Sequence, residues 1–142
     1  MQMSGIRSRI VTYDVGGESI KQVRENVFTK EQGVPIDIEI DGLDPKASHV
    51  IVFDAEEVIG TGRMLLDGHI GRIAVEKQYR GRGIGKTIIN ELVRVAGNLQ
   101  LSEVWLSSQC HAKAFYQKLG FFEVGDIYQE ADIDHIKMQK NL

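Results

Sequence analysis

The chain has 142 residues, of which 42% are hydrophobic and 26% charged, and its net charge at pH 7 is −3. This length fits a single domain over residues 1–142, and the acidic balance argues against a general nucleic-acid binder. The one cysteine, Cys110, excludes an intrachain disulfide and a metal site built on several cysteines.

The N-terminal part of the chain predicts a strand, a helix and an acidic loop. Residues 6–13 alternate loosely between apolar and polar side chains, as in a strand. Ser19, followed three residues later by Gln22, matches a capping box and predicts the start of a helix that ends near Gly33. Residues 36–47 are acidic and contain turn signals, so an irregular loop is expected there.

Three consecutive antiparallel strands are expected next, over residues 49–53, 58–66 and 69–75. The Asp67-Gly68 pair between the last two is a strong hairpin signal. The rest of the chain predicts a glycine-rich segment at residues 80–86 and helices over residues 84–97 and 111–119. Strands are expected over residues 103–107, 121–124 and 135–138.

The expected order is β-α-β-β-β-α-β-α-β-β. The strand–loop–helix–strand unit at residues 69–107 implies a parallel crossover, whereas the hairpins around it are antiparallel. The predicted fold class is therefore α/β, more specifically an α+β arrangement with one mixed, twisted sheet and helices on both faces.

The glycine-rich segment Arg80–Lys86 stands between a strand and a helix. Such a loop directs several backbone N–H groups at one point, at the positive end of the helix dipole, and predicts an anion site, with phosphate as the first choice. From Arg72 to Lys86 there are five cations and one acid, Glu76. A local positive patch in an acidic protein favours one small anion over a long polyanion.

Three kinds of phosphate-binding loop compete for this segment. A P-loop needs a glycine where Arg80 stands, although Gly85-Lys86-Thr87 matches its second half. A dinucleotide-binding loop needs the spacing G-x-G-x-x-G after a first parallel strand, whereas Gly81, Gly83 and Gly85 are spaced G-x-G-x-G after a meander. The third spacing, Arg80-x-x-Gly83-x-Gly85, resembles the acyl-CoA pyrophosphate signature of the GCN5-related N-acetyltransferases.

The resemblance to this family covers nearly the whole chain. Residues 71–75 look like the family's fourth strand, and residues 109–121 look like its segment N-x-x-A-x-x-x-Y-x-x-x-G-F, with Gln109 in place of the usual Asn. The N-terminal half is similar to the bacterial ElaA-like or YjcF-like subgroup at Arg24, Val27-Phe28, Glu31-Gln32-Gly33-Val34-Pro35, Glu39, Asp41, Asp44 and His49.

The family implies a fold with a splayed central parallel pair of strands and transfer of an acetyl group from acetyl-CoA to a primary amine. The acceptor is then a small molecule or a peptide, no metal takes part, and a homodimer is compatible with the family. The residues implied in acetyl-CoA binding are Ile73, Ala74, Val75, Arg80, Gly81, Arg82, Gly83, Ile84, Gly85, Lys86 and Gln109.

Three residues are implied in the chemistry. The N–H of Val75 is expected to bond the thioester oxygen as it becomes negative. Tyr116 matches the tyrosine that donates to the CoA sulfur, and a phenol is protonated at neutral pH. The position of the general base varies within the family. The candidates here are Glu31, Glu39 and Asp41, and we name Glu39 as the predicted base.

The remaining reactive side chains give weaker signals. Cys110 and His111 are neighbours on a helix and point about 100° apart, so they make a poor nucleophile–base pair. His69 and His135 show no metal-ligand spacing. The acidic stretch 31–44 suits a cationic acceptor. No apolar run is long enough to span a bilayer and Met1–Arg7 lacks the pattern of a signal peptide, so a cytoplasmic location without a membrane partner is expected.

A second class of function stays open from the sequence. The loop specifies the donor half of the reaction only, so the chain is also compatible with a non-catalytic acyl-CoA-binding sensor or interaction module. The two classes differ at Tyr116, which matters to turnover in an enzyme and not to ligand-dependent behaviour in a sensor.

Overall fold

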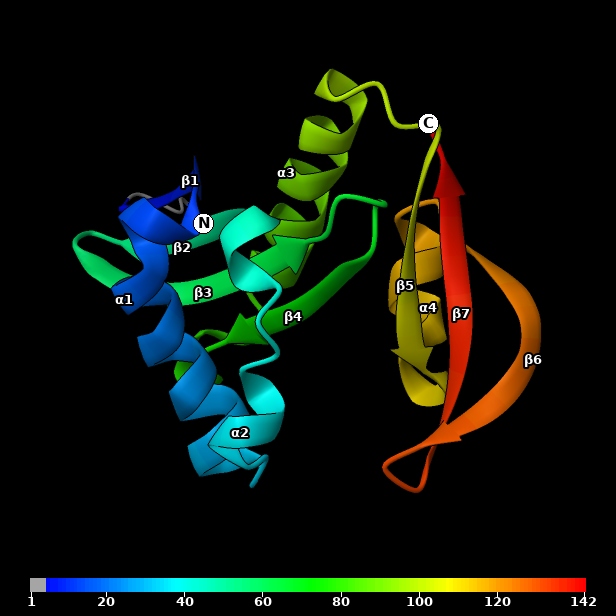
Figure 1. Ribbon diagram of the computed structural model, residues 1–142, viewed down its shortest axis with the longest axis horizontal. Coiled ribbons are helices and arrows are strands. Elements are labelled where there is room, and N and C mark those ends of the chain that lie inside the picture. Colours follow the sequence, from blue (N-terminus) through cyan, green and yellow to red (C-terminus); the bar gives the residue numbers. More distant parts are fainter. Residues whose placement is uncertain (1–4) are drawn as a thin grey trace.

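The computed structural model describes residues 5–142 as two antiparallel sheets with helices packed around them (Figure 1). The first sheet has the strand order β1-β2-β3-β4, with the bounds Ile6–Val11, Ser48–Asp54, Glu57–Met64 and Ile70–Val75. The second has the order β5-β7-β6, with the bounds Glu103–Gln109, Ile133–Asn141 and Phe122–Glu130. The α-helices α1 to α4 span Tyr13–Arg24, Ile36–Glu39, Ile84–Asn98 and Lys113–Lys118.

The predicted order of strands and helices is confirmed, with the short helix α2 as an addition. Residues 1–4, part of the N-terminal stretch in which no signal-peptide pattern is expected, lie outside the described residues. Between residues 5 and 142, none of the helices combines the length and apolar character that crossing a membrane requires.

The predicted single mixed sheet is divided into two. One isolated parallel bridge, between His69 just before β4 and Trp105 of β5, joins the two sheets, and there the Trp105 N–H donates to the Gly68 carbonyl at 3.0 Å. Beyond this point the two strands diverge, and Figure 1 shows the second sheet turned away from the first. The parallel pair expected at the centre of the fold is therefore splayed almost from its start.

Helices α1 and α3 cover opposite faces of the first sheet. On the α3 face, glycines in β3 allow close approach, because a Cβ built on Gly62 would lie 2.4 Å from Cγ2 of Ile88. On the other face, Ile20 of α1 packs with Val11 and Ile51. The largest buried cluster joins α3 to both sheets, which fixes the start of α3 relative to β4.

Helix α1 begins earlier than the capping box at Ser19 predicts. Thr12 is the N-cap, and its hydroxyl accepts a hydrogen bond from the Val15 N–H at 3.4 Å. The helix includes Gly16, where a Cβ would lie 2.6 Å from Val11 Cγ2. Tight packing of this glycine on the sheet thus outweighs its low helix propensity. The helix continues as a π-helical segment, Glu25–Glu31, and so ends close to the predicted position.

Buried ion pairs hold the acidic segment at residues 36–47, which the sequence predicts to be an irregular loop. Arg24 of α1 contacts Glu39 and lies 2.7 Å from Asp44, and Arg63 of β3 lies 2.9 Å from Asp41 and 3.2 Å from Asp44. Arg24, Arg63 and Asp44 are 2%, 4% and 3% exposed, so the Asp44 carboxylate is shared by two buried guanidinium groups. These contacts attach α2 to the first sheet.

We expect Asp44→Asn to destabilise the fold by about 3–5 kcal/mol, because it leaves two buried arginines without their shared counter-ion. Guanidinium chloride unfolding of the purified variant measures this loss. Glu91→Gln is the matched control: it removes the exposed Glu91–Arg94 pair and should change the free energy of unfolding by less than about 1 kcal/mol. Equal effects of the two substitutions would contradict the role given to Asp44.

Candidate active site

A β-bulge turns β4 away from β5. Strand β3 pairs Thr61 with Ala74 and Arg63 with Gly71, so two steps along β3 face three steps along β4. Inside the bulge Arg72 has φ of 50°, a left-handed conformation that is uncommon for residues other than glycine. The bulge brings the side chains of Arg72 and Ile73 to the lining of a cleft between the diverging strands.

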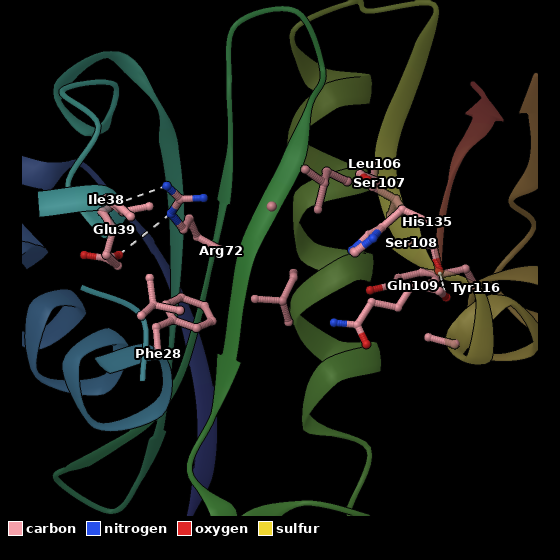
Figure 2. A pocket seen from close by; sticks show the side chains of 15 residues that line it. Phe28, Ile38, Glu39, Arg72, Leu106, Ser107, Ser108, Gln109, Tyr116 and His135 are labelled. Atoms are coloured by element: carbon pink, nitrogen blue, oxygen red, sulfur yellow. Dashed lines mark hydrogen bonds and ion pairs between the residues drawn. The ribbon is translucent and has the colours of Figure 1, made fainter. Parts of the chain in front are cut away.

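The cleft has a volume of about 350 Å³, and Figure 2 shows its two sides. Toward α2 its lining includes Phe28, Ile38, Glu39 and Arg72. Toward the second sheet and α4 it includes Leu106, Ser107, Ser108, Gln109, Tyr116 and His135. A second hollow, of about 430 Å³, lies at the glycine-rich loop, and Ile73 lines both.

The loop before α3 has the backbone geometry of an anion cradle. Gly81 and Gly83 have φ of 79° and 81°, and Gly83 is the N-cap of α3 without a side-chain cap. The first helical N–H to find a partner is that of Thr87, which donates to the Gly83 carbonyl at 3.1 Å. The N–H groups of residues 84–86 are therefore available at the positive end of the helix dipole. The side chains of Arg82 and Lys86 are exposed beside them.

Arg80, the first residue of the signature, is held by protein groups. Its Nε donates to the Val75 carbonyl at 3.0 Å, and its Nη atoms donate to both carboxylate oxygens of Glu31 at 2.6 and 2.7 Å. These hydrogen bonds from Arg80 lower the pKa of Glu31. The side chain ties the loop to the end of β4 and to the π-helical segment, which leaves Arg82 and Lys86 as the cations beside the cradle.

Strand β4 keeps one backbone edge open toward the cleft. The Glu76 N–H donates to the Ile59 carbonyl of β3 at 2.9 Å. Because N–H groups of consecutive strand residues point to opposite sides, the Val75 N–H points away from β3. The Val75 N–H thus lies on the edge of β4 that does not pair with β3.

Tyr116 lies where α4 faces the cleft, in an apolar setting. Its ring contacts Phe115 edge-on at a centroid distance of 5.0 Å and Phe121 at 6.0 Å. Burial raises the pKa of the Tyr116 phenol, so the hydroxyl remains a hydrogen-bond donor at neutral pH. Gln109, at the end of β5, lines the same side of the cleft.

Of the three predicted carboxylates, Glu39 alone belongs to the lining of the cleft among the described residues. It contacts Arg24, and its Oε1 lies 3.8 Å from Nε of Arg72. Asp41 is bound by Arg63, whose hydrogen bonds lower the pKa of Asp41 to about 2. Each carboxylate is therefore paired with an arginine.

The sequence reasoning missed four polar residues of the cleft, Arg72, Ser107, Ser108 and His135. Arg72 owes its position to the bulge, and His135 comes from β7, where it pairs in register with Gln109. In the last strand Ile136 and Met138 mark the core face, so the alternation puts residue 135 on the other face and gives no signal for the cleft. Within residues 5–142 no group of three or more His, Cys, Asp and Glu side chains is placed to hold a metal ion.

Comparisons with known proteins agree with this geometry. Residues 14–142 match the family model of the acetyltransferase (GNAT) domain. YjcF of Bacillus subtilis (strain 168), an uncharacterised N-acetyltransferase, is 37% identical over 123 residues, which cover 84% of this chain and 88% of YjcF. Crystal structures of Escherichia coli ElaA and of an acyl-CoA N-acyltransferase from Pseudomonas aeruginosa each superpose with a TM-score of 0.84 at 28% identity, covering 95% of this chain and 99% of theirs.

These matches confirm the resemblance to the family, to its ElaA-like and YjcF-like members, and to their fold. The chain belongs to the GNAT family of acyl-CoA N-acyltransferases.

Proposed function

We propose that this protein transfers an acetyl group from acetyl-CoA to a primary amine. One observation carries the proposal: the uncapped, glycine-rich start of α3 and Tyr116 open onto neighbouring hollows that share Ile73. This arrangement supports a donor whose pyrophosphate binds at the loop and whose sulfur reaches the phenol.

In this proposal the N–H groups of residues 81–86 bind the pyrophosphate, while Arg82 and Lys86 balance its charge. The open backbone edge of residues 73–75 pairs with the amides of the pantetheine arm. Gln109 faces that edge from the end of β5 and supplies a further amide contact.

The acceptor nitrogen attacks the thioester carbonyl directly, so a C–N bond forms and the C–S bond breaks. A backbone donor such as the Val75 N–H, aimed at the oxygen that becomes negative, is worth about 3–4 kcal/mol in other enzymes. Tyr116 gives its proton to the departing thiolate, for which the raised pKa of the buried phenol keeps the proton in place.

The acceptor nitrogen also loses a proton during the reaction. Two groups in the lining of the cleft, the Glu39 carboxylate and the His135 imidazole, are able to accept it. The other predicted candidates are less suited, because Arg80 lowers the pKa of Glu31 and Arg63 lowers that of Asp41.

The proposed acceptor is a small molecule or a peptide that carries a primary amine. The acidic residues expected to attract a cationic acceptor are bound to arginines, so negative charge alone does not select it. The proposed location is the cytoplasm, which agrees with the single cysteine.

Turnover with a panel of amines tests this function. We expect the purified protein to release free CoA thiol from acetyl-CoA in the presence of at least one amine, and to yield the acetylated amine by mass spectrometry. Binding of CoA without turnover across primary amines, amino acids and lysine peptides would instead support the sensor alternative.

We expect Gly83→Ala to weaken CoA binding about ten-fold, because a residue with a Cβ is strained at the φ of 81° found there. Isothermal titration with CoA measures the change. Gly97→Ala is the matched control: Gly97 lies near the far end of the same helix, and an added Cβ there would meet nothing within 4 Å. An equal loss in both variants would argue against the role of the Gly83 backbone.

We expect Tyr116→Phe to lower kcat about 10²-fold or more while the Kd of CoA changes less than three-fold, since a general acid contributes to turnover and not to ligand binding. Steady-state kinetics and titration with CoA separate the two effects. Tyr13→Phe serves as control, because Tyr13 packs on His49, outside the residues that line the cleft. Unchanged kcat in Tyr116→Phe would remove the phenol from the mechanism.

A further inference from the structure

We propose that the imidazole of His135 is the base that takes the proton from the acceptor amine. The inference rests on the proposed acetyl transfer and assigns one step of it to a residue outside the predicted catalytic set. Three observations support it: the position of the ring at the cleft, the hydrogen bond that fixes its tautomer, and the pairing of each of the three predicted carboxylates with an arginine.

His135 lies in the lining of the cleft, on the same side as Gln109 and Tyr116 (Figure 2). It is on β7, directly opposite Gln109 of β5 and Tyr128 of β6 in the antiparallel register. The residue is 8% exposed, and its ring stacks on Tyr128 at a centroid distance of 6.0 Å. Neighbouring strands on both sides therefore hold the ring at the cleft.

One hydrogen bond fixes which ring nitrogen carries the proton. Nδ1 of His135 lies 2.8 Å from the carbonyl oxygen of Ile133. A carbonyl oxygen only accepts, so Nδ1 is the donor, and Nε2 of the neutral ring carries the lone pair. Within residues 5–142, Nε2 makes no side-chain hydrogen bond, and its nearest charged partner is Oε2 of Glu130 at 3.9 Å. Nε2 is free to accept a proton.

The three predicted carboxylates are each paired with an arginine. Glu39 is the counter-ion of the buried Arg24 and also faces Arg72, so a proton on Glu39 would remove the charge that holds α2 against α1. Asp41 is held by Arg63 in the same way, and Glu31 by Arg80. Their ion pairs position the wall of the cleft opposite His135.

Polar side chains surround the imidazole. Tyr128 lies opposite His135 on β6 and Gln109 lies opposite it on β5, while Lys137 follows two residues later on β7. The Glu130 carboxylate of β6 lies 3.9 Å from Nε2, and its side chain is 60% exposed.

The protons balance over one cycle. The acceptor enters as an ammonium ion and loses one proton to solvent. Its nitrogen then attacks the thioester carbon and passes its second proton to Nε2 of His135, while Tyr116 protonates the thiolate that leaves. Proton return from the imidazolium to the phenolate, through water, restores both side chains.

The experiment compares His135→Asn with Glu39→Gln, using an amine that the wild-type protein acetylates. The Asn amide can keep the hydrogen bond to the Ile133 carbonyl and lacks a basic nitrogen. We expect His135→Asn to lower kcat/KM for the amine about 10²- to 10⁴-fold. We expect Glu39→Gln to cause a smaller loss. The Kd of CoA should stay within three-fold in both.

Added imidazole supplies a second readout, which a purely structural role would not change. We expect imidazole in the assay buffer to restore part of the activity of His135→Gly and to leave His111→Asn, a substitution of an exposed histidine, unaffected. A His135→Asn protein that keeps kcat/KM within three-fold, or a larger loss of kcat/KM in Glu39→Gln than in His135→Asn, would overturn the proposal. Absence of turnover by the wild-type protein with every amine would count against the proposed function itself.

Discussion

The separation of β4 from β5 is the constraint on which the rest of the site depends. The strands are joined at one end by the hydrogen bond from Trp105 to Gly68 and by the His69 ring, which stacks on Trp105 at 3.8 Å. A Cβ on Gly68 would lie 2.7 Å from the Glu103 carbonyl oxygen, so this close contact needs a glycine. From there the bulge at Arg72 carries β4 away from β5, so the peptide groups on that edge of β4 have no strand partner, whereas the other edge pairs with β3.

Charge fixes the opposite wall of the cleft. Arg24, Arg63 and Arg72 come from α1, β3 and β4, and they bind Glu39, Asp41 and Asp44 of one short segment. The three cations and three anions balance, so the segment is held firmly without giving the cleft a large net charge. From the sequence, these acidic residues suit a cationic acceptor. In the structure their ion pairs with arginines attach α2 to the first sheet.

Local patterns were enough to predict the strand order, the hairpin at Asp67-Gly68 and the loop before α3, because each depends on residues close together in the chain. The predicted start of α1 was wrong, because local sequence patterns do not reveal the packing of Gly16 on Val11. The division of the sheet and the ordering of residues 36–46 depend on side chains far apart in sequence. His135 entered the site in the same way, through the register of β7 against β5. The roles given to Val75, Tyr116 and Glu39 remain predictions, with positions that now make them testable.

An unpaired strand edge on the outside of a protein invites other chains to extend the sheet, and so promotes aggregation. Here the unpaired edge of β4 lies beside the cleft between the two sheets and not on an outer edge of the molecule (Figure 1). If the proposed CoA donor binds, its amide-bearing arm, which has no side chains, pairs with this edge. The splay would then place the hydrogen-bonding capacity of a sheet edge where neighbouring proteins have less access to it.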